Sequence, residues 1–223
     1  KGLWIAGLQR KLTLQNALFP FKLVSSLFKS YHILKKEKPD MVIGTGGFAS
    51  GPLLQMANIL GIPTLIQEQN SFAGKTNQFL AKKAKMICTA YPNMEHFFPN
   101  RTVVLTGNPV RSEIATNAIS KYQGNEFFGL AHQYKTVLIV GGSLGASSIN
   151  KTIANSLSEL MQQPVQLIWQ TGKTTADQFI KVASGHLNIW ADAFITDIDK
   201  AYAAADIVIS RSGAMAVTEL CVT

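Results

Sequence analysis

The chain has few of the residues that build a disulfide framework, a metal centre or a membrane span. Its 223 residues include two cysteines, Cys88 and Cys221, which lie far apart in apolar stretches, so we expect two buried free thiols in a reducing compartment. The four histidines are scattered and the carboxylates do not cluster, so no metal site is predicted. No apolar run reaches the roughly 18 to 20 residues that cross a bilayer, and the first residues lack the pattern of a secretory signal peptide.

Acidic residues are scarce in the first half of the chain. Residues 1–111 hold 14 Lys and Arg against 4 Asp and Glu, whereas residues 112–223 hold 7 against 9. A basic surface suits nucleic acid, anionic lipid or water alone. The basic stretch carries no nucleic-acid motif and its aromatic residues lie in an apolar patch, so we expect no nucleic-acid partner.

The same basic stretch is rich in apolar residues. From Pro20 onward the pattern predicts a helix with proline in its first turn. An apolar patch ringed by lysines is typical of peripheral membrane proteins. An ordinary amphipathic helix packed on a sheet gives the same pattern, so the residues alone leave both interpretations open. The candidate membrane face consists of Phe19, Phe21, Lys22, Phe28 and Lys29.

Short β-branched runs alternate with helical patterns along the rest of the chain. This alternation predicts an α/β fold with parallel sheets and right-handed crossovers. The turn-rich stretch 107–111, where the charge balance also changes, predicts a boundary between domains 1–111 and 112–223. Residues 112–133 look irregular or weakly helical. The predicted strands are 41–43, 63–67, 85–89, 102–106, 136–140, 165–170, 188–194 and 206–210.

The second half of the chain begins with a strand, a glycine turn and a helix. Residues 137–140 run into Gly141-Gly142-Ser143-Leu144-Gly145, and the apolar spacing after this turn predicts one helix over 146–160. Glycines let a backbone approach a phosphate, and a helix N-terminus presents free N–H groups. The glycine spacing fits neither the dinucleotide fingerprint nor a Walker A loop. The pattern therefore predicts a phosphate site, and a tight turn that binds nothing is the alternative.

A second glycine-rich turn follows the strand at 41–43. Residues 44–51 hold four glycines, more than a plain turn needs, which favours a ligand loop. The next strand leads into Gln67, Glu68 and Asn70, at the strand end that lines the ligand crevice in open α/β sheets. These three residues are candidates for contacting a polyhydroxy ligand. In the alternative interpretation, Asn70 caps the next helix and Glu68 is a solvated acid.

Five stretches of the chain, taken together, resemble the MurG family of N-acetylglucosaminyltransferases, which convert lipid I to lipid II in peptidoglycan synthesis. The resemblance implies the GT-B glycosyltransferase fold, in which two Rossmann-like domains take the lipid-linked acceptor and the nucleotide sugar respectively. The stretches occur in the family's order: PDMVIGTGGFASGP (39–52), QEQNSFAGKTN (67–77), LTGNPVR (105–111), VGGSLGA (140–146) and FITDIDKAYAAADIVISRSGAMAVTEL (194–220).

The resemblance also implies an activity. N-acetylglucosamine would pass from UDP-N-acetylglucosamine (UDP-GlcNAc) to the 4-hydroxyl of the N-acetylmuramyl-pentapeptide of lipid I, with inversion and without a cofactor or metal. The enzyme would act in cell wall biogenesis, peripherally on the cytoplasmic face of the bacterial plasma membrane. It would meet anionic lipid through its basic and apolar N-terminal face.

Site residues follow from the resemblance, position by position. Ser143 would contact the donor pyrophosphate, Ile195 would hold the uracil through its backbone, and Glu219 would bind the ribose. No catalytic residue is assigned, because the histidine proposed as the family's base would lie upstream of Lys1. The implied donor-binding set is Asn70, Arg111, Gly142, Ser143, Gly145, Ile195, Arg211, Ala214, Met215, Ala216, Val217, Thr218 and Glu219. The implied acceptor-binding set is Gly44, Gly46, Gly47, Phe48, Ser50, Gln67 and Glu68.

The chain departs from the family pattern at two of these positions. Gln67 stands where the family usually has histidine, and Phe48 where it usually has tyrosine, so a titratable group and a hydroxyl are missing. We also expect the sequence to be truncated at both ends and inactive on its own. Two alternatives remain: another UDP-sugar enzyme on the same fold, such as an epimerase, or a non-catalytic module that binds nucleotide sugars.

Overall fold

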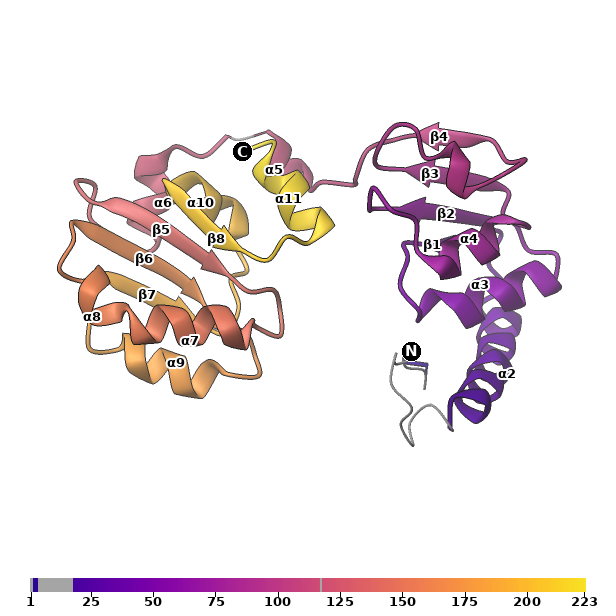
Figure 1. The fold of residues 1–223 in the computed structure, drawn as a ribbon, viewed down its shortest axis with the longest axis horizontal. Helices are drawn as coiled ribbons and strands as arrows, with labels where there is room; N and C mark the ends of the chain where they lie inside the picture. Colours follow the sequence, from indigo (N-terminus) through magenta and orange to yellow (C-terminus); the bar gives the residue numbers. More distant parts are fainter. Residues whose placement is uncertain (1, 4–17, 117) are drawn as a thin grey trace. The chain divides into compact units, whose positions relative to one another are not determined.

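The computed structural model describes residues 2–3, 18–116 and 118–223. The chain divides into two compact units, Lys1–Pro109 and Val110–Thr223. Within the described residues, each unit contains one four-stranded sheet whose strands all run parallel (Figure 1). The predicted α/β class with parallel sheets is confirmed.

The first unit has its strands in sequence order, β1-β2-β3-β4. The long helix α2 packs on α3 (Figure 1). The core of this unit contains the fully buried side chains of Leu54, Ile66, Leu80 and Ile87. The elements are α2 (Phe19–Glu37), β1 (Val42–Gly44), α3 (Ser50–Ile59), β2 (Thr64–Glu68), α4 (Lys75–Ala81), β3 (Met86–Thr89), the 3₁₀ turn η1 (Glu95–Phe97) and β4 (Val103–Leu105).

Gly44, at the end of β1, is required for packing. A Cβ atom at this position would overlap the side chain of Leu54 on α3. Glycine therefore lets α3 approach the strand, which is a structural reason for a glycine that the sequence pattern assigned to a ligand.

The second unit has the strand order β7-β6-β5-β8, so the chain winds from a central strand to both edges of the sheet. Its elements are α5 (Ser112–Ala115), α6 (Lys121–Phe127), β5 (Lys135–Val140), α7 (Ser147–Asn155), α8 (Leu157–Leu160), β6 (Val165–Gln170), α9 (Ala176–Ala183), β7 (Ile189–Asp192), α10 (Ile198–Ala204), β8 (Ile207–Ser210) and α11 (Ala214–Leu220).

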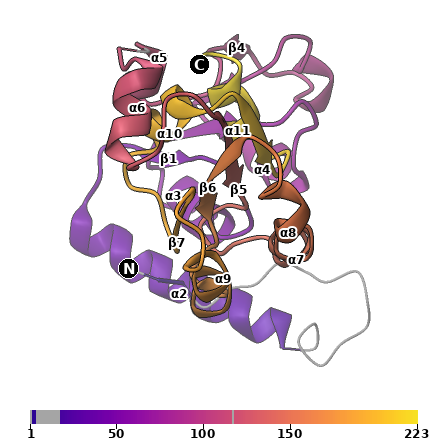
Figure 2. The same ribbon diagram turned by 90° about the vertical axis from the view of Figure 1, so that its left-hand side faces the viewer.

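This second sheet is covered on both faces. Leu138 and Ile168 point to the side of α6 and α10, whereas Ile139 and Trp169 point to the side of α7 and α9. Successive strand residues face opposite ways, so each strand supplies both cores. Figures 1 and 2 show the resulting three layers, with α6 and α10 on one side of the strands and α7 and α8 on the other.

Several expectations for the second unit were wrong in detail. The single helix expected over 146–160 is broken at Ser156 into α7 and α8, where Asn155 and Ser156 are weak helix formers. The stretch 112–133 contains α5 and α6, and α6 begins with a capping box in which Ser120 accepts from the N–H of Gln123. Cys88 is a buried free thiol as expected, but Cys221 is exposed because it lies just beyond the end of α11.

Asp206 connects three elements of the second unit. Its carboxylate accepts from the Lys121 ammonium at 2.6 Å, the Lys135 ammonium at 2.9 Å and the Thr136 N–H at 2.9 Å. Partial burial would raise the pKa of Asp206, but these three donors outweigh that effect and lower the pKa to about 2. The carboxylate thus holds the start of β8 against β5 and α6.

We predict that Asp206→Asn lowers the free energy of unfolding at pH 7 by about 1 kcal/mol, since ion pairs at a half-solvated site contribute modestly. The native pKa lies below the unfolded value of about 3.9, so this stabilisation is complete above pH 4 and is lost as the pH falls towards 2. Urea unfolding at several pH values measures the difference in the free energy of unfolding between wild type and Asp206→Asn. Asp177→Asn, which removes an exposed carboxylate of α9, is the control. A difference between wild type and Asp206→Asn that persists unchanged at pH 2 would contradict the account.

Candidate functional site

In the second unit, the glycine loop (residues 141–145) touches the loop that follows β6. Gly142 and Gly145 have φ values of +86° and +83°, and the Gly145 N–H donates to the Gly142 carbonyl at 2.9 Å. A Cβ atom at Gly145 would overlap the Thr171 carbonyl, and one at Gly172 would overlap the Gly145 backbone. These glycines are therefore required for two backbones to lie in direct contact at the carboxyl edge of the sheet.

Gln170, the last residue of β6, joins the glycine loop to the segment after β7. Its buried amide donates to the Gly142 carbonyl at 3.1 Å and accepts from the Ile195 N–H at 3.0 Å. Ile195 lies in a loop, because β7 ends at Asp192, and its N–H is occupied by this contact. Gln170 was not among the predicted site residues. The only available signal was a polar residue at the end of a buried strand.

Asn150 on α7 holds the loop that follows β6. It is buried, donates to the Thr171 carbonyl at 2.6 Å and the Thr175 hydroxyl at 3.0 Å, and accepts from the Trp169 indole N–H at 3.0 Å. A buried amide with its partners satisfied fixes the position of every group it contacts. Asn150 therefore joins α7 to the end of β6 and to the loop that follows it.

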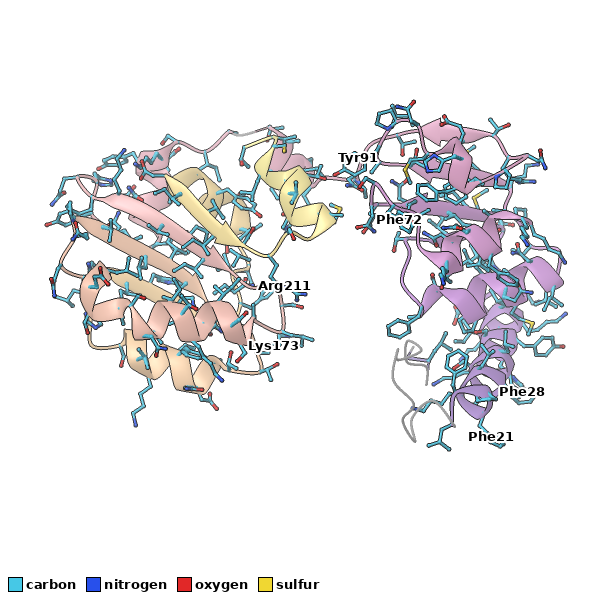
Figure 3. The ribbon with its side chains drawn as sticks, viewed as in Figure 1. Phe21, Phe28, Phe72, Tyr91, Lys173 and Arg211 are labelled. Atoms are coloured by element: carbon cyan, nitrogen blue, oxygen red, sulfur yellow. The ribbon has the colours of Figure 1, made fainter. Side chains whose placement is uncertain are left out.

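Two exposed cations, Lys173 and Arg211, follow strands at this edge of the second sheet. The Lys173 N–H donates to the Ser143 carbonyl at 3.2 Å, and Arg211 directly follows β8. Figure 3 shows the side chains of Lys173 and Arg211 on the same edge of the second unit. Backbone N–H groups, a helix N-terminus and two cations suit an anionic ligand such as a phosphate. The sequence analysis missed Lys173, although a Thr-Gly-Lys turn after a strand was visible.

Glu219 on α11 is held by two partners. Its carboxylate accepts from the Arg111 guanidinium at 3.3 Å and from the Tyr202 hydroxyl at 3.1 Å. Burial raises the pKa of Tyr202 to about 12, and the neighbouring Glu219 charge adds to this shift. Glu219 is buried and oriented, so it has the features of a residue that binds a hydroxyl. The other predicted α11 residues are half-buried or exposed, namely Ala214, Met215, Ala216, Val217 and Thr218.

In the first unit, a polar pocket of about 290 Å³ lies between the glycine-rich turn at residues 44–51 and the segment after β2. It brings together five predicted residues, and Ser50 supports it by donating to the Gly47 carbonyl at 2.9 Å. Gly44 and Gln67 do not line it. The lining residues are Thr45, Gly46, Gly47, Phe48, Glu68, Gln69, Asn70, Gly74, Thr76 and Asn77.

Glu68 organises this polar pocket. Its buried carboxylate accepts from the N–H and side-chain amide of Asn70, both at 3.1 Å, from the Gly74 N–H at 3.0 Å, and from the Asn77 amide at 2.8 Å. The alternative interpretation was therefore wrong, because Glu68 is not solvated and the N-cap of α4 is Gly74 rather than Asn70. Asn77 was missed, since nothing in its spacing links it to Glu68.

Gln67 connects two segments of the first unit through its side-chain amide. Its buried amide donates to the Gly107 carbonyl at 2.9 Å and accepts from the Thr106 hydroxyl at 3.2 Å. It thereby holds the segment after β4 against the end of β2. In the described part of the chain, no three His, Cys, Asp or Glu side chains gather closely enough to hold a metal ion.

Two protein-family models match this chain, one in each unit. The model of the glycosyltransferase family 28 N-terminal domain matches residues 1–89, and that of the glycosyltransferase family 28 C-terminal domain matches residues 136–223. The chain belongs to glycosyltransferase family 28. This assignment agrees with the resemblance stated from the five sequence stretches.

Curated relatives of this family 28 chain match it from end to end. A Flavobacterium psychrophilum protein is 55% identical over 222 residues, which are 100% of the chain and 60% of the relative. A Cytophaga hutchinsonii protein is 47% identical over 99% of the chain and 59% of its own length. Both are named UDP-N-acetylglucosamine–N-acetylmuramyl-(pentapeptide) pyrophosphoryl-undecaprenol N-acetylglucosamine transferase. The chain spans about 60% of the length of these relatives.

Solved structures agree on the fold. MurG of Acinetobacter baumannii is 35% identical with a TM-score of 0.60, over 100% of the chain and 59% of that protein. A UDP-GlcNAc 2-epimerase from Neisseria meningitidis has a TM-score of 0.64 at 15% identity, over 92% of the chain and 62% of that protein, which supports the fold alone. The GT-B fold class is therefore confirmed.

The contact between the two glycine-bearing loops gives a stability prediction. Gly172→Ala places a methyl group inside the Gly145 backbone at a φ of +79°, so we expect a loss of about 3 kcal/mol or more in the free energy of unfolding. Gly129→Ala is the matched control, because its φ is +65° but no atom lies within 4 Å of the added Cβ. It should cost only the backbone strain of about 1 kcal/mol. Equal losses in urea unfolding would show that the loop contact is unimportant.

Proposed function

We propose that the chain carries the two substrate-binding regions of an inverting N-acetylglucosaminyltransferase that converts lipid I to lipid II in peptidoglycan synthesis. The observation that carries this proposal is the 55% identity, along the entire chain, to a relative named for that transfer. In this proposal the first unit takes the acceptor and faces the membrane, and the second unit, which includes Arg111, takes UDP-GlcNAc.

The donor would bind at the carboxyl edge of the second sheet. Ser143 and the glycine-loop N–H groups would meet the pyrophosphate, with Lys173 and Arg211 beside them. Glu219, oriented by Arg111 and Tyr202, would accept hydrogen bonds from the ribose hydroxyls. The segment at Ile195 would meet the uracil through backbone groups other than its N–H, which Gln170 already occupies.

The acceptor would bind in the polar pocket of the first unit. The backbone of Gly46 and Gly47 would meet its pyrophosphate, since both residues line the pocket with positive φ values of +92° and +75°. Asn70, fixed by Glu68, would reach towards the sugars. Gln67 and Gly44 would support this pocket from outside its lining.

The reaction would be a single displacement. The 4-hydroxyl oxygen of the N-acetylmuramyl unit forms a bond to C1 of the donor sugar as the bond from C1 to the β-phosphate oxygen breaks. The bonding electrons leave with UDP, and the hydroxyl proton passes to a base that remains unassigned. Attack opposite the leaving group inverts C1. Each N–H donor aimed at the departing pyrophosphate is worth roughly 2 to 4 kcal/mol in a dry site.

Product analysis separates this proposal from its alternatives. Because the chain alone is expected to be inactive, the assay uses a chimaera in which it replaces the matching 60% of the Flavobacterium psychrophilum relative. Incubation of this chimaera with UDP-GlcNAc and a short-chain lipid I analogue should release UDP and an N-acetylglucosaminyl acceptor in equal amounts, with a β linkage visible by NMR. Formation of N-acetylmannosamine without the acceptor product would indicate an epimerase instead. Donor binding without any turnover would favour the non-catalytic module.

The contact between Tyr202 and Glu219 gives a second prediction. Tyr202→Phe keeps the packed ring but removes one donor to Glu219, so UDP affinity should fall roughly 3- to 10-fold, the usual net value of one hydrogen bond. A 2′,3′-dideoxy analogue of UDP should bind wild type and variant equally, because it lacks the hydroxyls that Glu219 contacts. Calorimetry measures both. Tyr122→Phe, which changes an exposed ring of α6, is the control. If Tyr202→Phe lost affinity for the dideoxy analogue by the same factor as for UDP, Glu219 would not bind the ribose hydroxyls.

A peripheral membrane position is proposed for the outward face of α2. Phe21, Val24 and Phe28 form an exposed apolar surface, in which Phe21 and Phe28 are 71% and 66% accessible (Figure 3). The exposed Lys29 follows Phe28 in the sequence. Phe19 lies instead on the inner side of the helix. No helix among the described residues is both long and apolar enough to cross a membrane. The surface would dock on the anionic cytoplasmic leaflet.

Vesicle binding tests this face. The double variant Phe21→Ser/Phe28→Ser should lower binding to phosphatidylglycerol vesicles at least tenfold, because each phenylalanine buried in lipid contributes about 1.5 to 3 kcal/mol. Cosedimentation measures the bound fraction. Leu187→Ser, at a fully exposed leucine of the second unit, should leave binding unchanged. Equal loss in both proteins would contradict the assignment of the docking face.

A further inference from the structure

Gln170 ends β6 at a point between two loops of the second unit. In the sheet β6 lies between β5 and β7 (Figure 1), and Gln170 pairs with Val140 on β5 and with Asp192 on β7. The glycine loop follows Val140 directly, and the loop that contains Ile195 follows Asp192. A side chain at the end of β6 is therefore within reach of both loops, and the Gln170 amide contacts both of them.

A carboxamide suits the two contacts of Gln170. Its nitrogen donates to the Gly142 carbonyl, and its oxygen accepts from the Ile195 N–H. The reverse orientation of the amide would bring two acceptors together at Gly142 and two donors together at Ile195, so these partners fix the orientation. The side chain is only 3% exposed. Gln170 is therefore placed to act on the two loops and not on a ligand directly.

Each of these contacts fixes the direction of a peptide group. The described peptide bonds are all trans, and in a planar trans peptide the carbonyl and the following N–H point in opposite directions. The Gly142 carbonyl points to Gln170, so the Ser143 N–H points away from Gln170. The Ile195 N–H points to Gln170, so the Phe194 carbonyl points away from it.

The two groups turned away from Gln170 differ in character. In the described part of the chain, neither the Ser143 N–H nor the Phe194 carbonyl has a hydrogen-bond partner. An N–H donor in a glycine loop suits a phosphate oxygen, whereas a carbonyl acceptor suits an N–H group of a base. One buried amide thus orients a donor on one loop and an acceptor on the other.

We propose that Gln170 is a positioning residue of the donor site, which presents the Ser143 N–H to the diphosphate and the Phe194 carbonyl to the base. This inference rests on the proposed function and adds a source of base selectivity to it. A carbonyl accepts from the N3–H of uracil, whereas N3 of cytosine carries a lone pair instead of a hydrogen. Gln170 therefore supports a preference for UDP over CDP as well as affinity for the diphosphate.

Gln166 provides a matched comparison at the other end of β6. It is 1% exposed and lies on the same side of the sheet as Gln170, because alternate residues of a strand share a face. Its amide donates to the Ala131 carbonyl at 2.7 Å and accepts from the Ala131 N–H at 3.0 Å. Replacement of either glutamine should destabilise the second unit, but only the replacement of Gln170 should change nucleotide recognition.

Nucleotide selectivity is the direct test. UDP, CDP and inorganic diphosphate are titrated by calorimetry at pH 8 into the chain and its variants. Gln170→Met keeps an unbranched side chain but removes the donor and the acceptor, so the affinities for UDP and diphosphate should fall about tenfold. The ratio of UDP to CDP affinity should fall towards one. Gln166→Met should keep the wild-type ratio.

The affinity ratio distinguishes positioning from a loss of structure. An unfolded fraction lowers the apparent affinities for UDP and CDP by the same factor, so it leaves their ratio unchanged. Urea unfolding measures how much each glutamine variant is destabilised. A wild-type ratio in Gln170→Met, or an equal change of the ratio in Gln166→Met, would overturn the proposal.

Gln170→Glu separates the two contacts. The ionised carboxylate still accepts from the Ile195 N–H, but it cannot donate to the Gly142 carbonyl. The affinity for diphosphate should therefore fall, while the ratio of UDP to CDP affinity should stay close to that of wild type. A ratio that falls as far in Gln170→Glu as in Gln170→Met would overturn the proposal, because the two contacts would not serve different parts of the ligand.

Titration of the wild-type chain with ADP keeps this test separate from that of the proposed function. If wild type prefers UDP to ADP but the Gln170 variants keep the wild-type ratio of UDP to CDP affinity, the role of Gln170 is wrong and the proposed function stands. If wild type does not prefer UDP to ADP, the proposed function fails and the role of Gln170 fails with it.

Discussion

A buried polar side chain at the carboxyl end of the second strand organises the candidate site in each unit. In the first unit Glu68 accepts four hydrogen bonds from the segment 70–77, and in the second Gln170 joins Gly142 to Ile195. Burying a polar group without partners costs several kcal/mol, so these side chains oblige the loops to adopt the positions that satisfy them. The glycine loop of the second unit depends on this constraint for its placement, because Gln170 donates to the Gly142 carbonyl.

In the second unit, the consequence is that two loops pack directly against each other at the carboxyl edge of the sheet. Gly145 and Gly172 bring two backbones into contact, and Asn150 holds the same region from the helix side. Preorganised N–H groups lose little freedom when a phosphate binds, which is what a site for a charged ligand requires. Glu219 follows the same principle, since Arg111 and Tyr202 fix its carboxylate before any ribose arrives.

The sequence was sufficient for features that depend on local order. Strands, glycine turns and the parallel α/β class follow from β-branched runs, glycine spacing and strand–helix alternation, and α2 follows from Pro20 and its apolar spacing. The sequence was insufficient where a partner lies far along the chain. Gln170 and Ile195 are 25 residues apart, and Gln67 and Gly107 are 40 apart. For Glu68 the residues alone left a ligand-contacting role and a solvated acid both open, because its partners Gly74 and Asn77 are brought to it only by the fold.

The central claim is that the carboxyl edge of the second sheet is a uridine-nucleotide site. Calorimetric titration of the 223-residue chain with UDP-GlcNAc, UDP and ADP tests it most directly. We expect saturable binding of both uridine ligands, each clearly tighter than ADP, because the segment at Ile195 would select the base. ADP binding as tightly as UDP, or more tightly, would contradict it.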